Sequence, residues 1–272
     1  MLGDERGWIR MHIYSFLQAV RDKSPLVHHI TNWVTIFDCA QVVKSFGASP
    51  VMAHAPEEVE AMTSIASALV LNIGTLTTDV VDSMKMAAVA ANRKGIPIVL
   101  DVCGAGATPF RDAKCIELLD SAQIGIIKGN SSEIARVAGL KVATQGVDAG
   151  QVSADLREVA KSLSERRACT VVITGAEDVV ASNGKLFLIH NGHPMMAKLV
   201  GTGCMATSVI GTFAGATPDQ VPEAAAAGLA CYEIAAELAV KKAEGPASFK
   251  QHLFDCIYQL DEKQIRALQQ VV

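Results

Sequence analysis

Residues 68–101, ALVLNIGTLTTDVVDSMKMAAVAANRKGIPIVLD, contain two short aliphatic runs separated by a helical pattern. Residues 68–74 predict a buried strand that ends in glycine, and residues 95–101 predict the next strand. Between them, apolar residues recur at helical spacing, so we expect a helix over residues 78–94 with Thr78 as its N-cap. A strand, a helix and a second strand in this order indicate a βαβ unit and therefore parallel strands.

The same alternation continues toward the C-terminus. The further elements that we expect are a helix over residues 111–120, a strand over 124–127, a helix from Ser131 and a strand over 170–174. Residues 179–190 then hold two strand-like runs joined by Asn183-Gly184, which predicts an antiparallel hairpin at the edge of the sheet. A glycine-rich turn at residues 201–203 opens a helical region that we expect to reach about Glu244, and a final helix follows from about Ser248.

The composition suits one large α/β domain. Of the 272 residues, 50% are hydrophobic, 19% are charged and only 5% are aromatic. Strands that are buried on both faces of a sheet have continuous aliphatic sequences, as the predicted strands do here. We find no repeat and no linker, so we expect a single domain over residues 1–272, built as a central, mostly parallel β-sheet flanked by helices.

Charge and cysteine content exclude several classes of protein. The formal net charge is −4 and no cluster of lysine and arginine occurs, which argues against a nucleic-acid partner. Seven cysteines are scattered with no CxxC pair, so we expect neither a disulfide framework nor a zinc site, and a reducing, cytoplasmic location fits better. Residues 1–20 lack the apolar core of a secretory signal, and no uninterrupted apolar stretch approaches the ~18 residues of a membrane span, so we expect neither feature.

The carboxyl ends of the predicted strands point to the location of a ligand site. In open α/β sheets, ligands bind beyond those ends. The rule selects segments from well-separated parts of the sequence: Asn72 with Gly74, residues 101–106, residues 128–133, and Thr174 with Gly175. We expect these segments to lie together and to form one site.

The segment Gly201-Thr202-Gly203-Cys204 precedes an expected helix. Glycines at a helix N-terminus let backbone N–H groups approach an anion, and the helix dipole adds to the attraction. The pattern is compatible with a phosphate site. An ordinary glycine-rich turn explains it equally well, because short glycine motifs are common. The segment is not a Walker A loop, since no Gly-Lys-Ser/Thr follows.

Two acidic residues lie near expected strand ends. Asp101 precedes a glycine-rich turn, and Glu133 follows Lys128-Gly-Asn130. Magnesium prefers one or two carboxylates together with water and phosphate oxygens, so Asp101 and Glu133 would suffice as its protein ligands. The alternative for Asp101 is a strand-terminating turn. For Glu133 it is helix capping with Asn130 or Ser131, which in isolation is the simpler explanation.

A series of short motifs occurs along the chain in a fixed order. They are Ser24-Pro-Leu-Val-His28, Ile30-Thr-Asn32, Gly47-Ala-Ser-Pro-Val-Met52, Asn72-Ile-Gly-Thr75, Gly104-Ala-Gly-Ala-Thr108, Lys128-Gly-Asn-Ser-Ser-Glu133, Thr174-Gly175 and Gly201-Thr-Gly-Cys204. Together, and in this order, they resemble the hydroxyethylthiazole kinase family over nearly the whole chain, from about Ser24 to Phe249. The set is specific, although no single motif is.

The resemblance implies a ribokinase-like fold and a transferase that uses ATP and Mg²⁺ to phosphorylate the hydroxyl of 4-methyl-5-(2-hydroxyethyl)thiazole in thiamine biosynthesis and salvage. It also implies a homotrimer with active sites at the subunit interfaces. The site residues that it implies are Met52 and Gly201 as substrate contacts, Lys128 and Thr174 as ATP contacts, Asp101 and Glu133 as acids near the magnesium, and Cys204 where most ribokinase-like enzymes carry a general-base aspartate.

The chain departs from the family pattern in two regions. The family often has Asp-Pro-Val-Gly-Ala-Gly where this sequence has Asp101-Val102-Cys103-Gly104 before Ala-Gly. It usually has an Ala-Asn pair where this sequence has Ala40-Gln41, and Lys44 stands in a usually aliphatic stretch. The second region helps to form the acceptor pocket and the interface in the family, so these changes bear on acceptor preference and on oligomeric packing.

Two other functions are compatible with these residues. A kinase for another small alcohol, such as a pyrimidine or a sugar, would use the same fold, although Cys204 in place of aspartate argues against it. A ligand-binding or regulatory protein without activity is the other, and intact Asp101, Glu133 and residues 201–204 argue against that. A measurement of magnesium-dependent ATP turnover, with and without the thiazole alcohol, distinguishes the thiazole kinase from these two alternatives.

Overall fold

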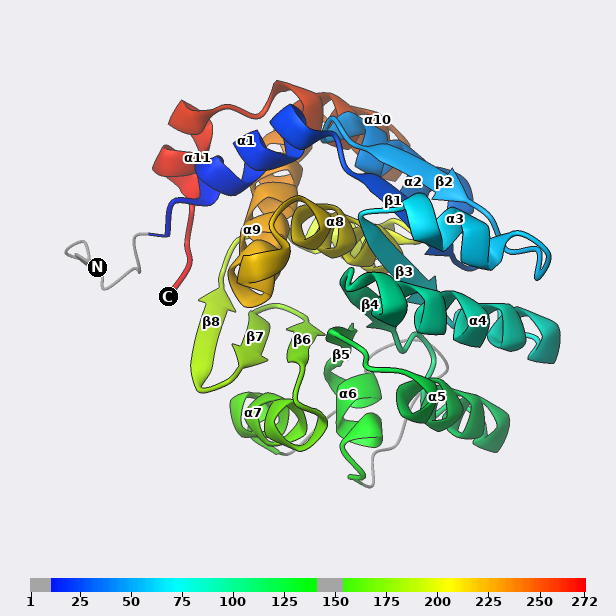
Figure 1. Cartoon of the computed structure of the whole chain (residues 1–272). Coiled ribbons are helices and arrows are strands. Elements are labelled where there is room, and N and C mark those ends of the chain that lie inside the picture. Colours follow the sequence, from blue (N-terminus) through cyan, green and yellow to red (C-terminus); the bar gives the residue numbers. More distant parts are fainter. Residues whose placement is uncertain (1–10, 141–153) are drawn as a thin grey trace.

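One eight-stranded sheet runs through the molecule in the order β2-β1-β3-β4-β5-β6-β7-β8 (Figure 1). The computed structural model describes residues 11–140 and 154–272. The strands are β1 (Leu26–Ile30), β2 (Ser49–Met52), β3 (Ala68–Asn72), β4 (Ile98–Asp101), β5 (Ile126–Asn130), β6 (Thr170–Thr174), β7 (Asp178–Ser182) and β8 (Lys185–Ile189). All pairs from β2 to β6 are parallel, whereas β7 and β8 are added antiparallel. The predicted mostly parallel sheet and its antiparallel hairpin are therefore confirmed.

Helices cover both faces of the sheet (Figure 1). One layer consists of α1 (Ile13–Lys23), α2 (Ile36–Ser45), α8 (Thr202–Ala216), α9 (Val221–Val240), α10 (Pro246–Gln259) and α11 (Glu262–Leu268). The other consists of α3 (Val59–Ile65), α4 (Thr78–Lys94), α5 (Pro109–Ser121), α6 (Ser131–Val137) and α7 (Leu156–Arg167). Val70 and Val99 pack into the first layer, and their neighbours Leu69 and Leu100 pack into the second, because successive strand residues face opposite sides.

The unit predicted from residues 68–101 forms as β3, α4 and β4. Every residue of β3 is buried. The helix ends before Gly95, which adopts the left-handed conformation with φ of 77°. Its N-cap is Thr77, not Thr78 as predicted, because Thr77 is extended and its hydroxyl accepts a hydrogen bond of 3.3 Å from the Val80 amide.

Two strands begin later than predicted. β4 starts at Ile98, after Pro97, which has no N–H to donate to a ladder. β5 starts at Ile126 and continues to Asn130, because it pairs with β4 as far as Lys128 and with β6 as far as Asn130. Residues 128–130, predicted to connect a strand to a helix, are therefore part of the strand.

The helical region predicted after residue 203 consists of two helices. A short 3₁₀ turn, Pro218–Gln220, separates α8 from α9, because proline cannot continue the hydrogen-bond pattern of a helix. The next helix begins at Pro246 and not at Ser248, since proline is favoured in the first helical turn. The last helix, α11, was not predicted.

The two edges of the sheet differ. At β8, Leu188 and Val272 exchange two backbone hydrogen bonds of 2.8 and 2.9 Å, so the C-terminal residues continue the sheet by a short antiparallel bridge. At the other edge, within the described ranges, β2 pairs with β1 alone. Among residues 11–140 and 154–272, only the β8 edge is thus extended by the chain itself.

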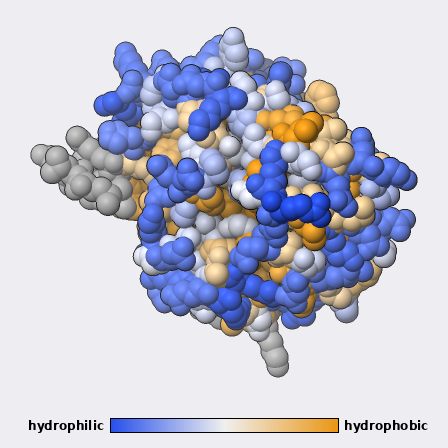
Figure 2. Space-filling view, in the orientation of Figure 1, coloured by the Kyte–Doolittle hydropathy of each residue, from blue (hydrophilic) through white to orange (hydrophobic). Residues whose placement is uncertain are grey.

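The surface is mainly hydrophilic on the face seen in Figure 2, with hydrophobic patches on the side that carries α2 and β2. Among residues 11–140 and 154–272, no helix has both the length and the apolar character of a membrane span. Residues 1–10 of the segment considered for a secretory signal lie outside the described ranges, so that expectation stays a prediction.

Gly211 of α8 lies so close to β3 that a methyl group would overlap the side chain of Val70. We predict that Gly211→Ala lowers the free energy of unfolding by about 1–3 kcal/mol, the usual cost of overpacking, despite the better helix propensity of alanine. Urea unfolding measures the change. Gly125→Ala is the control, because a methyl group there meets only the Ile98 backbone, at 3.4 and 3.6 Å. Equal unfolding midpoints for the two variants would contradict this close packing.

Candidate active site

A cavity of about 540 Å³ opens at the carboxyl ends of the strands. Its lining comes from residues at or after the ends of β1, β3, β4, β5 and β6, as the rule for open α/β sheets predicts, and from residues 197–200 and the start of α8. Of the predicted site residues, it brings together Asp101, Lys128, Glu133, Thr174, Gly201 and Cys204. Met52, the last residue of the edge strand β2, lies outside this lining.

A buried ion pair forms part of the cavity wall. Lys128 Nζ lies 3.5 Å from Asp101 Oδ2, and the two residues are 4% and 1% exposed. The same aspartate oxygen accepts hydrogen bonds from Thr207 Oγ1 at 2.6 Å and from Asn72 Nδ2 at 2.9 Å. In contrast, Asp101 Oδ1 is buried with no hydrogen-bond partner among the described residues. Such an oxygen is available to a bound ion or water.

The ammonium group of Lys128 stays charged. Burial alone would lower the pKa of Lys128, but the carboxylates of Asp101 and Glu133 reverse this and hold the pKa above its usual value. Lys128 Nζ also donates a hydrogen bond of 3.0 Å to the carbonyl oxygen of Gly203. The lysine therefore joins β5 to the first turn of α8.

Glu133 caps a helix and lines the cavity at the same time. Asn130 and Glu133 form a capping box, in which each side chain accepts a hydrogen bond from the other residue's backbone N–H, at 2.9 and 2.7 Å. The second oxygen of Glu133 accepts from the Gly104 amide at 2.7 Å. Burial and the nearby Asp101 raise the pKa of Glu133 to about 6, although Lys128 acts to lower it. The capping alternative is confirmed, and it does not remove the carboxyl from the cavity.

The N-terminus of α8 has no side-chain cap. Four helices of the other layer are capped by side chains, those of Thr77, Thr108, Asn130 and Asp155. In α8 the N-cap is Gly201, and no acidic residue stands in the first turn. Gly201 has φ of 91°, and a methyl group there would lie 2.5 Å from Thr35 Cγ2, so both backbone and space require glycine. The free N–H groups and the dipole make this helix end suitable for an anion.

The sulfur of Cys204 is surrounded by hydrogen-bond donors. Asn32 Nδ2 lies 3.3 Å and Asn72 Nδ2 lies 3.4 Å from Sγ. A hydrogen bond with the Cys103 thiol lowers the pKa of Cys204 to about 7, although burial and Asp101 act in the opposite direction. The same hydrogen bond raises the pKa of Cys103. Cys204 is thus the thiol of the pair that more easily loses its proton.

Three contributors to the site were not predicted. Thr207 donates to Asp101, and a polar residue on the largely buried α8 was its only signal. The guanidinium group of Arg111 donates two hydrogen bonds of 2.7 Å to carbonyl oxygens after β3 and one of 3.1 Å to Cys103, so it joins the loops after β3 and β4. The contact between Cys103 and Cys204 had no signal, because it depends on how α8 meets the strand ends.

A second cavity, of about 510 Å³, adjoins the first and shares Thr174, Ala197, Thr202 and Gly203 with it. It contains a buried acid pair, Asp178 of β7 and Glu233 of α9. Burial raises the pKa of Asp178 to about 6. Burial and the neighbouring carboxylate raise the pKa of Glu233 well above its usual value.

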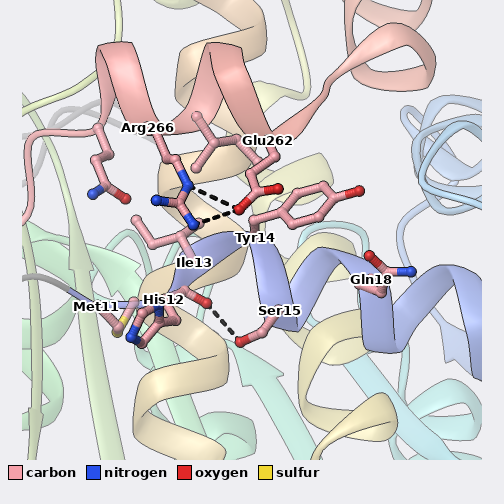
Figure 3. A pocket seen from close by; sticks show the side chains of 10 residues that line it. Met11, His12, Ile13, Tyr14, Ser15, Gln18, Glu262 and Arg266 are labelled. Atoms are coloured by element: carbon pink, nitrogen blue, oxygen red, sulfur yellow. Dashed lines mark hydrogen bonds and ion pairs between the residues drawn. The ribbon is translucent and has the colours of Figure 1, made fainter.

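A larger cavity, of about 750 Å³, lies away from this site between α1 and α11 (Figure 3). Its residues Glu262 and Arg266 are paired with each other, with Arg266 Nε 2.8 Å from Glu262 Oε1. Its lining comes from two helices and their flanks, with no strand end among the described residues. We therefore place the candidate active site at the strand ends, where titratable groups with shifted pKa values converge.

Sequence comparison connects the chain to one family. The model of the hydroxyethylthiazole kinase family matches residues 17–263. A hydroxyethylthiazole kinase from Methanosarcina mazei is 51% identical over 255 residues, which cover 94% of this chain and 97% of that protein. A hydroxyethylthiazole kinase from Chloroflexus aurantiacus is 47% identical over 250 residues, which cover 92% of this chain and 93% of that protein.

Comparison with solved structures supports the same assignment of the fold. The hydroxyethylthiazole kinase from Pyrococcus horikoshii has a TM-score of 0.87 at 36% identity and covers 96% of this chain and 98% of its own. A ribokinase-like superfamily protein from Enterococcus faecalis has a TM-score of 0.61 at 14% identity, with 92% and 90% covered, which shows likeness of fold alone. The predicted ribokinase-like architecture is confirmed.

The buried acid pair should make stability depend on pH. The pKa values of Asp178 and Glu233 are raised in the folded state. Above the unfolded-state pKa values of about 4, the folded protein therefore still holds protons that the unfolded chain has released. Because of this difference, the free energy of unfolding falls as the pH rises. Glu233→Gln keeps the shape and removes one acid. We predict a higher Tm than that of the wild type at about pH 8 and a smaller difference at about pH 5, measured by differential scanning fluorimetry.

Other charges near the pair are Glu237 on α9 and Lys128 on β5, and neither is changed in this test. Asp178→Asn removes the other acid and should change Tm with the same sign. A Tm difference that is absent, or that is equal at the two pH values, would contradict the assigned protonation of the pair.

Proposed function

This chain belongs to the hydroxyethylthiazole kinase family, and on that basis we propose that it transfers the γ-phosphoryl group of ATP to the hydroxyl of 4-methyl-5-(2-hydroxyethyl)thiazole in thiamine biosynthesis and salvage. The observation that carries the proposal is a single cavity in which Cys204, Lys128 and the two acids Asp101 and Glu133 lie at an uncapped helix N-terminus. Phosphoryl transfer depends mainly on positioning and on neutralisation of charge, and these groups can supply both.

The phosphate groups of ATP would bind at the N-terminus of α8. Residues 201–204 offer backbone N–H groups that no side chain caps. Lys128 lies beside this turn and carries its charge toward the same space. Thr174 lines both this cavity and the adjoining one, so we assign Lys128 and Thr174 to ATP and the adjoining cavity to the remainder of the nucleotide.

Magnesium fits the acids of the cavity. No cluster of three or more histidine, cysteine or acidic side chains that could hold a metal occurs among the described residues. An ATP-bound Mg²⁺ needs fewer protein ligands, because one or two carboxylates complete a coordination shell of water and phosphate oxygens. Asp101, whose Oδ1 has no hydrogen-bond partner within those ranges, and Glu133 would hold it. When bound, the ion would neutralise charge on the transferred phosphoryl group.

We assign Cys204 to the acceptor alcohol. It stands in the first turn of α8 next to Gly201, which we assign to substrate contact. Its sulfur, held by the amides of Asn32 and Asn72, can accept the proton of the hydroxyl group. In a loose transition state the proton leaves late, so orienting the hydroxyl matters as much as basicity.

The active unit is proposed to be a homotrimer in which Met52 of one subunit completes the cavity of another. In the single chain, Met52 ends the edge strand β2 and does not reach the cavity. Apolar side chains are exposed around the opening: Val34 and Val200 line the cavity at 68% and 71% exposure, and Phe37 follows on α2 at 73%. Such a surface is typical of an interface, and the number of subunits comes from the family pattern.

Purified protein should form the phosphorylated thiazole only when ATP, Mg²⁺ and the thiazole alcohol are all present, as followed by ADP release and mass spectrometry. A kinase for another alcohol would phosphorylate a pyrimidine alcohol or a sugar in preference. A ligand-binding protein without activity would form no product with any acceptor.

In the same assay, Cys204→Ala should lower kcat by about ten-fold or more, the scale of a lost transition-state contact, while ATP binding by calorimetry survives. Cys204→Asp should retain substantial activity, because a carboxylate can also accept the proton. Cys256→Ala, at a buried cysteine of α10, is the matched control. A fully active Cys204→Ala together with an inactive Cys204→Asp would mean that the residue only packs.

The shared site can be tested with two variants in one assembly. Met52→Asn should raise KM for the thiazole, and Cys204→Ala should lower kcat. In mixed trimers, some cavities would pair an intact Cys204 with an intact Met52 of the neighbour, so a fraction of the sites should recover the wild-type KM and kcat. Light scattering confirms that each variant keeps the wild-type mass. An active monomer, or no recovery in mixed trimers, would contradict the proposed assembly.

A further inference from the structure

A buried histidine next to the edge strand takes no part in the chemistry described above. His28 of β1 is 0% exposed and does not line the cavity. Its ring contacts two other segments: Nε2 lies 2.7 Å from the carbonyl oxygen of Ala53, and Nδ1 lies 2.9 Å from Oγ1 of Thr63 on α3. One imidazole therefore connects β1, the residue that follows β2, and α3.

The hydrogen atoms of this ring can be assigned from its partners. The carbonyl oxygen of Ala53 can only accept, so Nε2 carries a hydrogen and donates it. Burial lowers the pKa of His28, although the Ala53 carbonyl group and Glu58 act to raise it, so the ring is neutral at neutral pH and Nδ1 carries no hydrogen. The hydroxyl group of Thr63, which also lies 2.7 Å from the carbonyl oxygen of Val59, then donates to Nδ1. The bond to Ala53 is therefore the one in which histidine is the donor.

Ala53 lies just beyond the paired part of the edge strand. The paired residues of β1 and β2 end at His29 with Met52, and within the described ranges β2 pairs with β1 alone. The hydrogen bond from His28 holds the backbone one residue further, on the C-terminal side of Met52. The backbone of Met52 is therefore fixed from two directions, by the strand pairing and by the imidazole.

The segment 52–54 is also connected to the opening of the cavity in the same chain. The ring of His54 packs edge-on against that of Trp33, with 4.7 Å between the ring centroids and 84° between the planes. The backbone N–H of Trp33 donates a hydrogen bond of 3.1 Å to Oγ1 of Thr75, which lines the cavity, as do the residues on either side of Trp33. The segment that His28 fixes thus lies beside the candidate active site.

We propose that His28 is a positioning residue for the acceptor alcohol, because its hydrogen bond to Ala53 fixes the place from which Met52 reaches the cavity of a neighbouring subunit. The proposal rests on the function proposed above, in which Met52 contacts the thiazole. His28 itself touches neither a substrate nor a reacting atom. Its loss should weaken binding of the acceptor and leave the transfer step intact, because the groups that line the cavity are unchanged.

Two replacements of His28 separate its two hydrogen bonds. The amide group of glutamine reaches about as far as Nε2, so His28→Gln can still donate to Ala53. The shorter amide of asparagine ends near the place of Nδ1, so His28→Asn reaches Thr63 alone. Thr63→Val is the matched control, because it removes the other hydrogen bond of the ring and leaves the one to Ala53.

In the full-length enzyme, His28→Asn should raise KM for the thiazole alcohol by about five- to ten-fold, the size of one lost hydrogen bond. Its kcat and its KM for ATP should stay at the wild-type values. His28→Gln and Thr63→Val should keep all three constants, whatever their effect on Tm. A merely structural role would lower Tm in His28→Asn and Thr63→Val alike, with no selective change in KM for the thiazole.

The position of Met52 can be followed by NMR without an activity assay. Methionine methyl groups are isotope-labelled, and the Met52 signal is assigned with Met52→Leu. This signal should shift in His28→Asn and coincide with that of the wild type in His28→Gln and Thr63→Val. Nitrogen NMR of the wild-type imidazole should show the hydrogen of His28 on Nε2 at neutral pH, and this measurement requires no variant to fold.

A neutral ring with its hydrogen on Nδ1 would overturn the proposal, because Ala53 would then receive no hydrogen bond. So would a His28→Asn enzyme whose Met52 signal and KM for the thiazole match those of Thr63→Val. If the Met52 signal of the wild type does not respond to saturating thiazole alcohol, the role of Met52 in the proposed function is wrong. The failure of that function and the failure of the role of His28 therefore give different results.

Discussion

The buried contact between Asp101 and Lys128 is the interaction on which the active-site end of the molecule depends. A buried carboxylate is unfavourable unless charged and hydrogen-bonding partners surround it. Asp101 obtains its partners from three neighbours: Lys128 of β5, Asn72 of β3 and Thr207 of α8. These contacts hold adjacent strand ends in register and place α8 against them. The glycine turn and Cys204 receive their positions from the same set of contacts.

The central strands could be predicted because local sequence encodes their burial. In β3 every side chain is buried, and the sequence is an unbroken aliphatic run apart from Asn72. β1 was not predicted, since Leu-Val-His-His-Ile contains two polar side chains. His28 and His29 are nevertheless 0% and 1% exposed, and His28 Nε2 lies 2.7 Å from the carbonyl oxygen of Ala53. Burial of this strand depends on tertiary hydrogen bonds, which no local pattern shows.

The location of the site was predictable, and its internal contacts were not. Asp101, Lys128 and Thr174 lie in one cavity because each occupies the carboxyl-terminal part of a neighbouring parallel strand. That relation follows from the order of elements. How near Cys103 lies to Cys204 depends on the angle and distance at which α8 packs on the sheet. Close packing such as that at Gly211 sets this angle and distance. Sequence periodicity carries no information on such distances.

The unequal edges of the sheet restrict how copies of this chain can join. An unpaired edge strand is a template for another strand. The edge at β8 is occupied by the chain's own last residues, Val271 and Val272, and within the described ranges β2 pairs with β1 alone. A filament needs two complementary surfaces on every copy, so that each addition leaves a new one free. The bridge between Ile189 and Val271 takes up part of the β8 edge, so the two edges of the sheet are not equivalent templates for a strand of another copy.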